Sequence, residues 1–305
     1  MLPEDQDARP DAAFPAMTVG QMAIIRRLVL RALAERGVEA TFNDDGTAIT
    51  RADGHTYGLD NLVATCGNTP SRDWNDVVAN HFAAMLSAED QPGVEELAWP
   101  ELSRRVRSRV LSVAQADDTP GDMLSYAWPL AEGLVEVLCV DYPEVVKYLN
   151  GDQVSRHDAE ELRRVARHNT NAEPIDEVSV QEAHDAQYRI LAGQSVFVGS
   201  KILDVAALVP GYVGDPSHGV IVGAPSRNYL MIHEMMDAKS AVAALNAMAP
   251  ACLTLAERNP GPISGDLYFW KDGQLQRISR IEPTTQTISV EVRGALAQAL
   301  EELDR

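Results

Sequence analysis

The stretch L-V-E-V-L-C-V-D-Y-P-E-V-V-K-Y-L, residues 134–149, decides how the middle of the chain folds. Its first half is an apolar run rich in β-branched residues that only Glu136 interrupts, which is typical of a strand buried on most of both faces. Such a strand needs neighbours on both sides, so we expect it at the centre of a sheet. Its second half predicts a helix, because Asp141, Pro143 and Glu144 have the spacing of a capped helix start.

Outward from this stretch, helical periodicity and turn dipeptides divide the N-terminal half into short elements. Thr18 and Gln21 have the spacing of a capping box and predict a helix that ends at Gly37. The other predicted elements of this half are strands at 38–42, 47–51, 55–59 and 105–111 and helices at 60–66 and 74–86.

The C-terminal half shows the same kind of alternation. Asp272-Gly273 is the turn dipeptide that most favours a two-residue hairpin loop, here between strands at 267–271 and 274–281. The remaining predictions are helices at 158–169, 201–209, 238–248 and 290–303, the last capped by Ser289, and strands at 178–183, 187–191, 195–198, 219–224 and 228–233.

The order of these elements predicts an α+β fold with antiparallel sheets. Both halves read α-β-β-β-α-β-β-α, so we expect two successive units of one plan. The predicted boundaries are a disordered tail at 1–16, a first unit at 17–150, a second unit at 151–250, and a C-terminal hairpin and helix at 251–305 that pack on the second unit.

Composition excludes several functions. A formal net charge of −19 over 305 residues repels phosphate backbones, so nucleic-acid binding is not expected. Plain solubility is the favoured explanation of this acidity, and the alternative is a protein partner, for which a basic surface would be complementary. No apolar run approaches the roughly 20 residues that cross a bilayer. The acidic N-terminus and three widely separated cysteines indicate a cytoplasmic protein without contact to a membrane.

Five stretches carry a resemblance to a known family. They are residues 61–82, beginning N-L-V-A-T-C, L-C-V-D-Y-P at 138–143, S-V-F-V-G-S-K-I-L at 195–203, V-I-V-G-A-P-S-R-N-Y-L at 220–230 and G-P-I-S-G-D-L-Y-F-W-K-D-G at 261–273. Over residues 18–282 the chain resembles the YtpQ-like family of bacterial proteins, which supplies no activity and no catalytic residues to carry over. The order of elements also looks like that of type III secretion chaperones and YbjN-like proteins, here present twice.

Motifs for nucleotide binding and hydrolysis are missing from the sequence: there is no P-loop, no G-x-G-x-x-G after a strand, no G-x-S-x-G and no H-E-x-x-H. No cofactor is therefore predicted. His157, Glu161 and His168 fall on one stripe of a predicted helix and could ligate zinc. However, Arg164 lies in that stripe and repels a cation, which favours a solvated helix face with an ordinary Glu161–Arg164 pair.

Two surfaces are candidates for binding a partner. Arg105, Arg107 and Arg109 alternate along a predicted strand, and their guanidinium groups match carboxylate or phosphate, although pairing with nearby acids is the alternative. Tyr268 and Trp270 share one face of the last hairpin, whose other face is also apolar. Both faces must then be covered, by this chain or by another one.

These observations favour a non-enzymatic protein-binding module, either chaperone-like or immunity-like. The alternative is an enzyme with a dispersed site, with or without a metal ion, around His157, Glu161 and His168, with His81 and the three arginines as further candidates.

Overall fold

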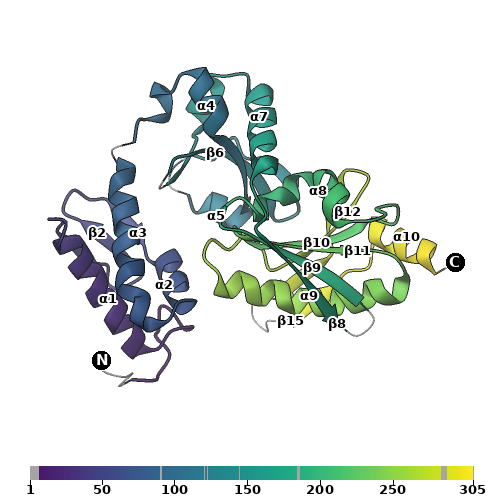
Figure 1. Ribbon diagram of the computed structural model, residues 1–305, viewed down its shortest axis with the longest axis horizontal. Helices are drawn as coiled ribbons and strands as arrows, with labels where there is room; N and C mark the ends of the chain where they lie inside the picture. The colour runs from purple at the N-terminus through teal and green to yellow at the C-terminus, as the bar shows by residue number, and fades with distance from the viewer. Residues whose placement is uncertain are drawn as a thin grey trace. The chain divides into compact units, whose positions relative to one another are not determined.

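The computed structural model describes residues 7–89, 91–119, 121, 123–143, 145–183, 186–282 and 287–304 (Figure 1). Helices and antiparallel strands both contribute, so the predicted α+β class is confirmed. The chain forms two compact units, Met1–Gln91 with Arg258–Pro260, and Pro92–Glu257 with Gly261–Arg305. The expected boundary at residue 150 falls inside the second of these units.

The first unit packs three helices with a small antiparallel sheet. Its elements are α1 (Val19–Ala34), β1 (Ala40–Phe42), β2 (Ala48–Arg51), β3 (Thr56–Gly58), α2 (Asp60–Gly67), the 3₁₀ turn η1 (Ser71–Asp73) and α3 (Trp74–Glu89). The predicted capping box of α1 is present, with the Thr18 hydroxyl accepting from the Gln21 amide. The apolar stripes of α1 and α3 meet in one core that includes Met22, Ile25 and Phe82.

The predicted N-terminal tail is ordered over the part that the structure describes. Phe14 is buried in the core of the first unit, and Asp11 is buried beside Arg26, 3.1 Å from its guanidinium. Residues 7–16 are therefore anchored by an apolar contact and an ion pair, which corrects the prediction of disorder for them. Residues 1–6 lie outside the described residues.

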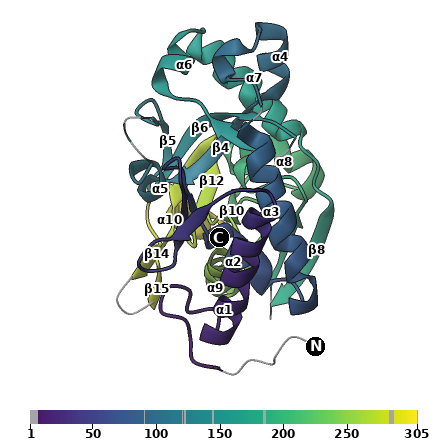
Figure 2. The same ribbon diagram turned by 90° about the vertical axis from the view of Figure 1, so that its left-hand side faces the viewer.

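The second unit begins with a four-stranded sheet centred on β6. Its elements are η2 (Val94–Glu96), α4 (Trp99–Arg105), β4 (Val106–Ser112), α5 (Val113–Asp117), β5 (Trp128–Ala131), β6 (Leu134–Asp141), β7 (Val146–Tyr148), α6 (Gly151–Ser155) and α7 (Ala159–Ala172). Strand β6 lies between β4 and β5 and also pairs with β7, so its predicted central place is confirmed. Helices α4 and α7 lie beside this sheet (Figures 1 and 2).

The helix predicted after Asp141 is wrong, because the chain turns back as β7 instead. Asp141 pairs with Val146 and Cys139 with Tyr148, which closes a hairpin with β6. β-Branched valines at 145 and 146 favour a strand, and the segment is too short to form a stable helix. Glu144, the third residue of the predicted cap, lies outside the described residues.

A six-stranded antiparallel sheet fills the rest of the second unit, in the order β13-β12-β10-β11-β9-β8. Its strands are β8 (Glu177–Ala183), β9 (Ala186–Ala192), β10 (Val220–Ser226), β11 (Tyr229–Glu234), β12 (Leu267–Lys271) and β13 (Gln274–Arg277). The other elements are η3 (Gly199–Asp204), α8 (Val205–Tyr212), α9 (Ala238–Arg258), the β14–β15 hairpin (Ser279–Glu282 and Thr287–Val290) and α10 (Gly294–Leu303). Asp272 and Gly273 both have positive φ, 51° and 78°, as the predicted two-residue turn requires.

Several predicted elements differ from the structure. Residues 195–198 form a turn and not a strand, and the helix expected over 201–209 is split into η3 and α8. The last helix begins at Gly294, because residues 287–290, which include the predicted cap Ser289, pair with β14. Strand β12 pairs with β10, so the C-terminal hairpin belongs to the large sheet, and the two halves do not repeat one order of elements.

Helices cover both faces of the large sheet (Figure 1). Val205 and Leu208 of α8 pack on one face, and α9 and α10 pack on the other. Among the described residues, α9 is the helix that is long and apolar enough to cross a membrane by length and composition, and a third of its apolar window is buried in the structure. The buried side of α9, including Leu245 and Met248, belongs to the core on this face of the sheet.

Candidate functional site

The three arginines predicted to share a strand face are divided between two elements. Arg105 is the last residue of α4 and pairs with Glu101, 2.9 Å away and four positions earlier on the same helix. Only Arg107 and Arg109 lie on β4, two positions apart and therefore on one face. The prediction that all three arginines lie on one strand is wrong for Arg105, because α4 extends up to the start of β4.

Arg107 and Arg109 have different surroundings. Arg107 is half-buried and pairs with Glu173 at 2.8 Å, and the other carboxylate oxygen of Glu173 accepts from the Ser195 hydroxyl at 2.8 Å. The guanidinium of Arg109 lies over the ring of Tyr148, 5.6 Å from its centroid. Within the described residues, no carboxylate lies at ion-pair distance from Arg109, and its Nε is buried without a hydrogen-bond partner. Pairing with acids, the alternative for these arginines, accounts for Arg105 and Arg107 but not for Arg109.

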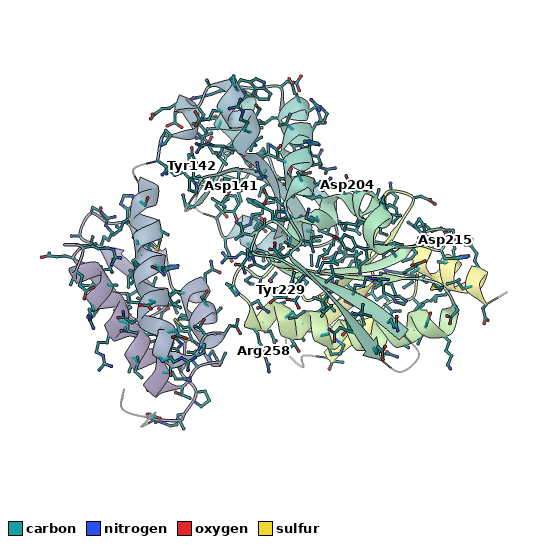
Figure 3. All side chains as sticks on the ribbon, viewed as in Figure 1. Asp141, Tyr142, Asp204, Asp215, Tyr229 and Arg258 are labelled. Carbon is teal, nitrogen blue, oxygen red and sulfur yellow. The ribbon has the colours of Figure 1, made fainter. Side chains whose placement is uncertain are left out.

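Antiparallel register places further polar groups on the face that carries Arg107. Cys139 on β6 lies opposite Arg107 on β4 and opposite Tyr148 on β7. Burial raises the pKa of the Cys139 thiol to about 12, so this sulfur is a poor nucleophile. Asp141 and Tyr142 lie where β6 ends (Figure 3). Burial raises the pKa of Asp141, and the charge of Arg107 opposes this change.

The two aromatic candidates of the last hairpin are covered by the chain itself. Tyr268 and Trp270 pair with Val222 and Val220 of β10, and Tyr268 is fully buried in the core on that side of the sheet. Trp270 is half-buried and packs against the same core. The hairpin is apolar on both faces because β12 is an interior strand, so neither face of Tyr268 is available to a partner.

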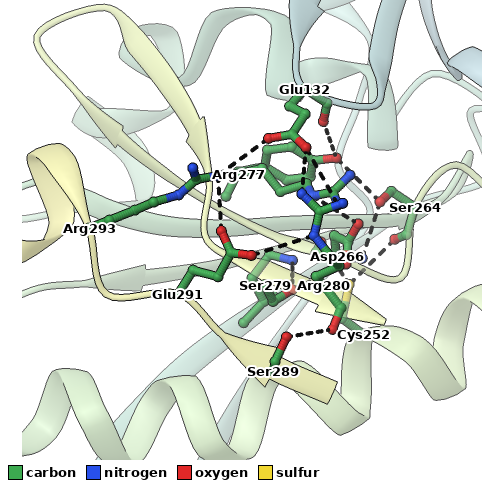
Figure 4. Close-up of polar contacts among 12 residues, drawn as sticks. Glu132, Cys252, Ser264, Asp266, Arg277, Ser279, Arg280, Ser289, Glu291 and Arg293 are labelled. Atoms are coloured by element: carbon green, nitrogen blue, oxygen red, sulfur yellow. Dashed lines mark hydrogen bonds and ion pairs between the residues drawn. The ribbon is translucent and has the colours of Figure 1, made fainter. Parts of the chain in front are cut away.

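An ion-pair network joins the β5–β6 turn to the C-terminal strands (Figure 4). Glu132 lies 2.7 Å from Arg280, 3.4 Å from Arg293 and 3.7 Å from Arg277. Arg277 also lies 3.6 Å from Asp266. Each cation of this network faces a carboxylate, so the cluster has the character of a structural crosslink between segments far apart in the sequence.

The residues of the alternative metal site do not gather into one site. His157 is half-buried and packs against Trp99, with ring centroids 5.6 Å apart and the ring planes tilted by 35°, whereas His168 is exposed on α7. Glu161 lies 4.0 Å from Arg164, the ordinary surface pair that the spacing predicts. Across the described ranges, no group of three or more His, Cys, Asp or Glu side chains could hold a metal ion. His81, another candidate of the enzymatic alternative, packs edge-on against Phe82.

Two buried charged residues were not singled out as sites by sequence reasoning. Glu136 is fully buried at the centre of β6 and accepts hydrogen bonds from Arg163 (2.7 Å), Arg167 (2.8 Å) and the Ser108 hydroxyl (2.8 Å). Lys201 is buried in η3 and donates to the Asn171 carbonyl at 2.7 Å, at the end of α7. A charge inside an apolar stretch was the available signal for Glu136.

Strand β8 forms one edge of the large sheet and has unusual exposure for its sequence. It pairs with β9 alone, so the other side of its backbone lies at the edge of the sheet. Val178 and Val180 are 45% and 52% exposed on one face of this strand. Glu177 and Glu182 flank them, and the strand carries no lysine or arginine. An exposed apolar edge of this kind is a template for pairing with another extended chain.

Comparison with known proteins adds no relative. No family model, no curated protein and no solved structure matches the chain. The resemblance to the YtpQ-like family therefore stays a prediction.

One buried histidine predicts a pH dependence of stability. The Nδ1 of His233 donates to the Gln187 carbonyl at 2.7 Å, and the Nε2 of the same ring is buried without a partner among the described residues. Burial lowers the pKa of the His233 imidazole. The unfolded chain, with a histidine pKa of about 6.5, binds this proton more readily. Stability should therefore be lost as the pH falls below about 6.5 and through the lower folded pKa.

Urea unfolding at pH values from about 5 to 8 measures this effect. The His233→Phe variant should lose much of the slope in this range. The exposed His168→Asn variant is the control and should keep it. An unchanged slope in His233→Phe would show that other groups produce the dependence.

Proposed function

We propose that this protein is a non-enzymatic binding module that holds a partner protein along the free edge of β8. The observation that supports this proposal is the exposed Val178–Val180 pair on an edge strand flanked by carboxylates. The partner segment would add as a further antiparallel strand, with main-chain hydrogen bonds supplying affinity and side-chain contacts supplying specificity. A chaperone-like or immunity-like role in the cytoplasm fits such an edge.

The negative charge on β8 indicates which kind of partner segment would pair with it. Glu177 and Glu182 are exposed on β8, no cation lies on that strand, and the whole chain has a net charge of −19. An extended segment that alternates lysine or arginine with β-branched residues complements both the carboxylates and the two valines. This proposal keeps the basic partner that composition leaves as an alternative and places its contact on a sheet edge, away from Tyr268 and Trp270.

Synthetic seven-residue peptides test the proposal. A Lys/Val alternating peptide should bind about tenfold more tightly than its Glu/Val counterpart, which corresponds to about 1.4 kcal/mol. It should shift the backbone amide resonances of residues 177–183 in nuclear magnetic resonance spectra. N-methylation of alternate peptide amides should abolish binding, because a methylated amide cannot donate to the strand.

Matched variants locate the contact. Val180→Lys adds a cation to the edge and should lower the affinity for the Lys/Val peptide. Val242→Lys changes a valine on α9 that is similarly exposed, at 48%, and should leave this affinity unchanged. In the native host, a photo-crosslinking side chain at position 180 should capture a partner that one at position 242 does not. Equal binding of the two peptides, or equal effects of the two variants, would rule out β8 as the docking strand.

A further inference from the structure

A second arginine comes close to Arg109 from a different part of the chain. The Val110 amide, next to Arg109, donates to the Ser200 hydroxyl at 3.1 Å, and the Gly199 amide, next to Ser200, donates to the Arg227 carbonyl at 3.0 Å. Arg227 is in the turn between β10 and β11, and its guanidinium is half-buried. The backbone of this turn is fixed on both sides: the Arg227 amide donates to the Gly261 carbonyl at 2.8 Å, and its carbonyl accepts from the Gly199 amide at 3.0 Å. The aliphatic part of the Arg227 side chain covers Gly261, where a β-carbon would lie 2.6 Å from its Cδ.

These two guanidinium groups affect each other electrostatically. Burial lowers the pKa of Arg227, and the positive charge of Arg109 lowers it further. The Tyr148 ring faces Arg109, and the charges of both arginines act on its hydroxyl against the effect of burial. Two like charges are thus held together beside one aromatic ring, an arrangement that costs free energy unless an anion lies between them.

Neither guanidinium group of this pair has a compensating carboxylate among the described residues. Among the described residues, the only side-chain hydrogen bond of Arg227 goes to the Asn228 amide oxygen at 3.3 Å, and neither arginine forms an ion pair. In the same unit and the same described ranges, Arg107 is paired with Glu173 and Arg167 with Glu136. The buried and unpartnered Nε of Arg109, together with a second uncompensated guanidinium group beside the same ring, is the pattern of a binding site and not of a structural ion pair.

We propose that Arg109 and Arg227 form an oxyanion site that binds a phosphoryl dianion, with Tyr148 as its aromatic wall. Two guanidinium forks supply a charge of two and several parallel N–H donors, which match the charge and the oxygens of a phosphate group better than a single carboxylate does. Both side chains are partly exposed, so a ligand can reach them from solvent. The site is separate from the β8 edge and does not depend on the partner proposed there.

Isothermal titration calorimetry with inorganic phosphate tests the site, at constant ionic strength with chloride as the balancing anion. Phosphate should bind with saturable heat, and acetate, a monoanionic carboxylate, should bind at least about tenfold more weakly. Phenyl phosphate is the second probe. Tighter binding of phenyl phosphate assigns the site to a phosphoryl group on a larger ligand, and tighter binding of inorganic phosphate assigns it to the free anion.

Variants connect the binding to the two side chains. Arg109→Gln and Arg227→Gln should each reduce phosphate affinity at least about tenfold. Arg104→Gln removes an exposed arginine of α4 and should leave affinity unchanged. If a glutamine variant does not fold, Arg227→Lys keeps the charge and should bind more weakly than the wild type, because lysine lacks the fork. The proposal would be overturned if titration with phosphate gave the same heats as titration with chloride. It would also be overturned if all three glutamine variants lost the same share of phosphate affinity.

Discussion

Glu136→Ala is expected to destabilise the protein by about 3–5 kcal/mol. The Glu136 carboxylate is fully buried in the central strand, where it accepts from Arg163, Arg167 and Ser108. Its removal leaves two guanidinium groups without their counter-charge against the sheet. Because a folded domain is stable by about 5–15 kcal/mol, one substitution would remove a large share of the total.

The same triad predicts sensitivity to acid. Burial raises the pKa of Glu136, but the hydrogen bonds and charges of Arg167 and Arg163 outweigh burial and hold it below its usual value. The folded pKa thus lies below the unfolded value of about 4.3. The contribution of Glu136 to stability is present above that value and is lost as the pH falls through the folded pKa.

Urea unfolding at neutral pH measures the loss, with two control variants. Glu132→Ala also removes a carboxylate that faces arginines, but its side chain is 49% exposed, so a much smaller effect is expected. The combined replacement Glu136→Leu, Arg163→Met and Arg167→Met exchanges the triad for apolar side chains and should be far less destabilising than Glu136→Ala alone. Equal losses for Glu136→Ala and Glu132→Ala would show that the buried triad contributes little.

The sequence predicts best where the signal is local. The apolar run at 134–140 identifies the central strand, Thr18 and Gln21 identify the start of α1, and Asp272-Gly273 identifies a hairpin turn. Each of these signals acts over a few residues, because caps, turns and strand alternation are properties of neighbouring positions. The α+β class follows from the same signals.

Contacts between residues that are far apart in the sequence are not predictable from such local signals. Glu136 is visible as an interruption, but its arginines lie on the face of α7 away from the stripe with His157 and His168. The covering of Tyr268 depends on β12 pairing with β10, a contact that no local pattern encodes. The same limit explains why Arg109 was singled out without Arg227, which a different sheet supplies.

Gly199→Ala is expected to cost about 1–3 kcal/mol, and more if the backbone cannot shift. A β-carbon at this position would lie 2.2 Å from the Ser226 carbonyl oxygen and 2.8 Å from Cδ1 of Ile263. The nearer atom belongs to the backbone, so it cannot rotate away as a flexible side chain can. The Gly199 amide also donates to the Arg227 carbonyl at 3.0 Å, so a backbone shift that relieves the clash would strain this hydrogen bond to the same turn.

Displacement of this turn moves Arg227 relative to Arg109, and phosphate affinity should therefore fall together with stability. Gly211→Ala is the matched control, since Gly211 is exposed in α8 with no atom within 4 Å of the added carbon, and alanine should stabilise that helix by about 0.5–1 kcal/mol. Urea unfolding and phosphate titration on both variants separate the two positions. If Gly199→Ala unfolds at the wild-type urea concentration and binds phosphate as tightly, the close approach of η3 to this turn does not position the site. A loss of both would show that the anion site depends on the packing of the 226–227 turn against Gly199 and Gly261.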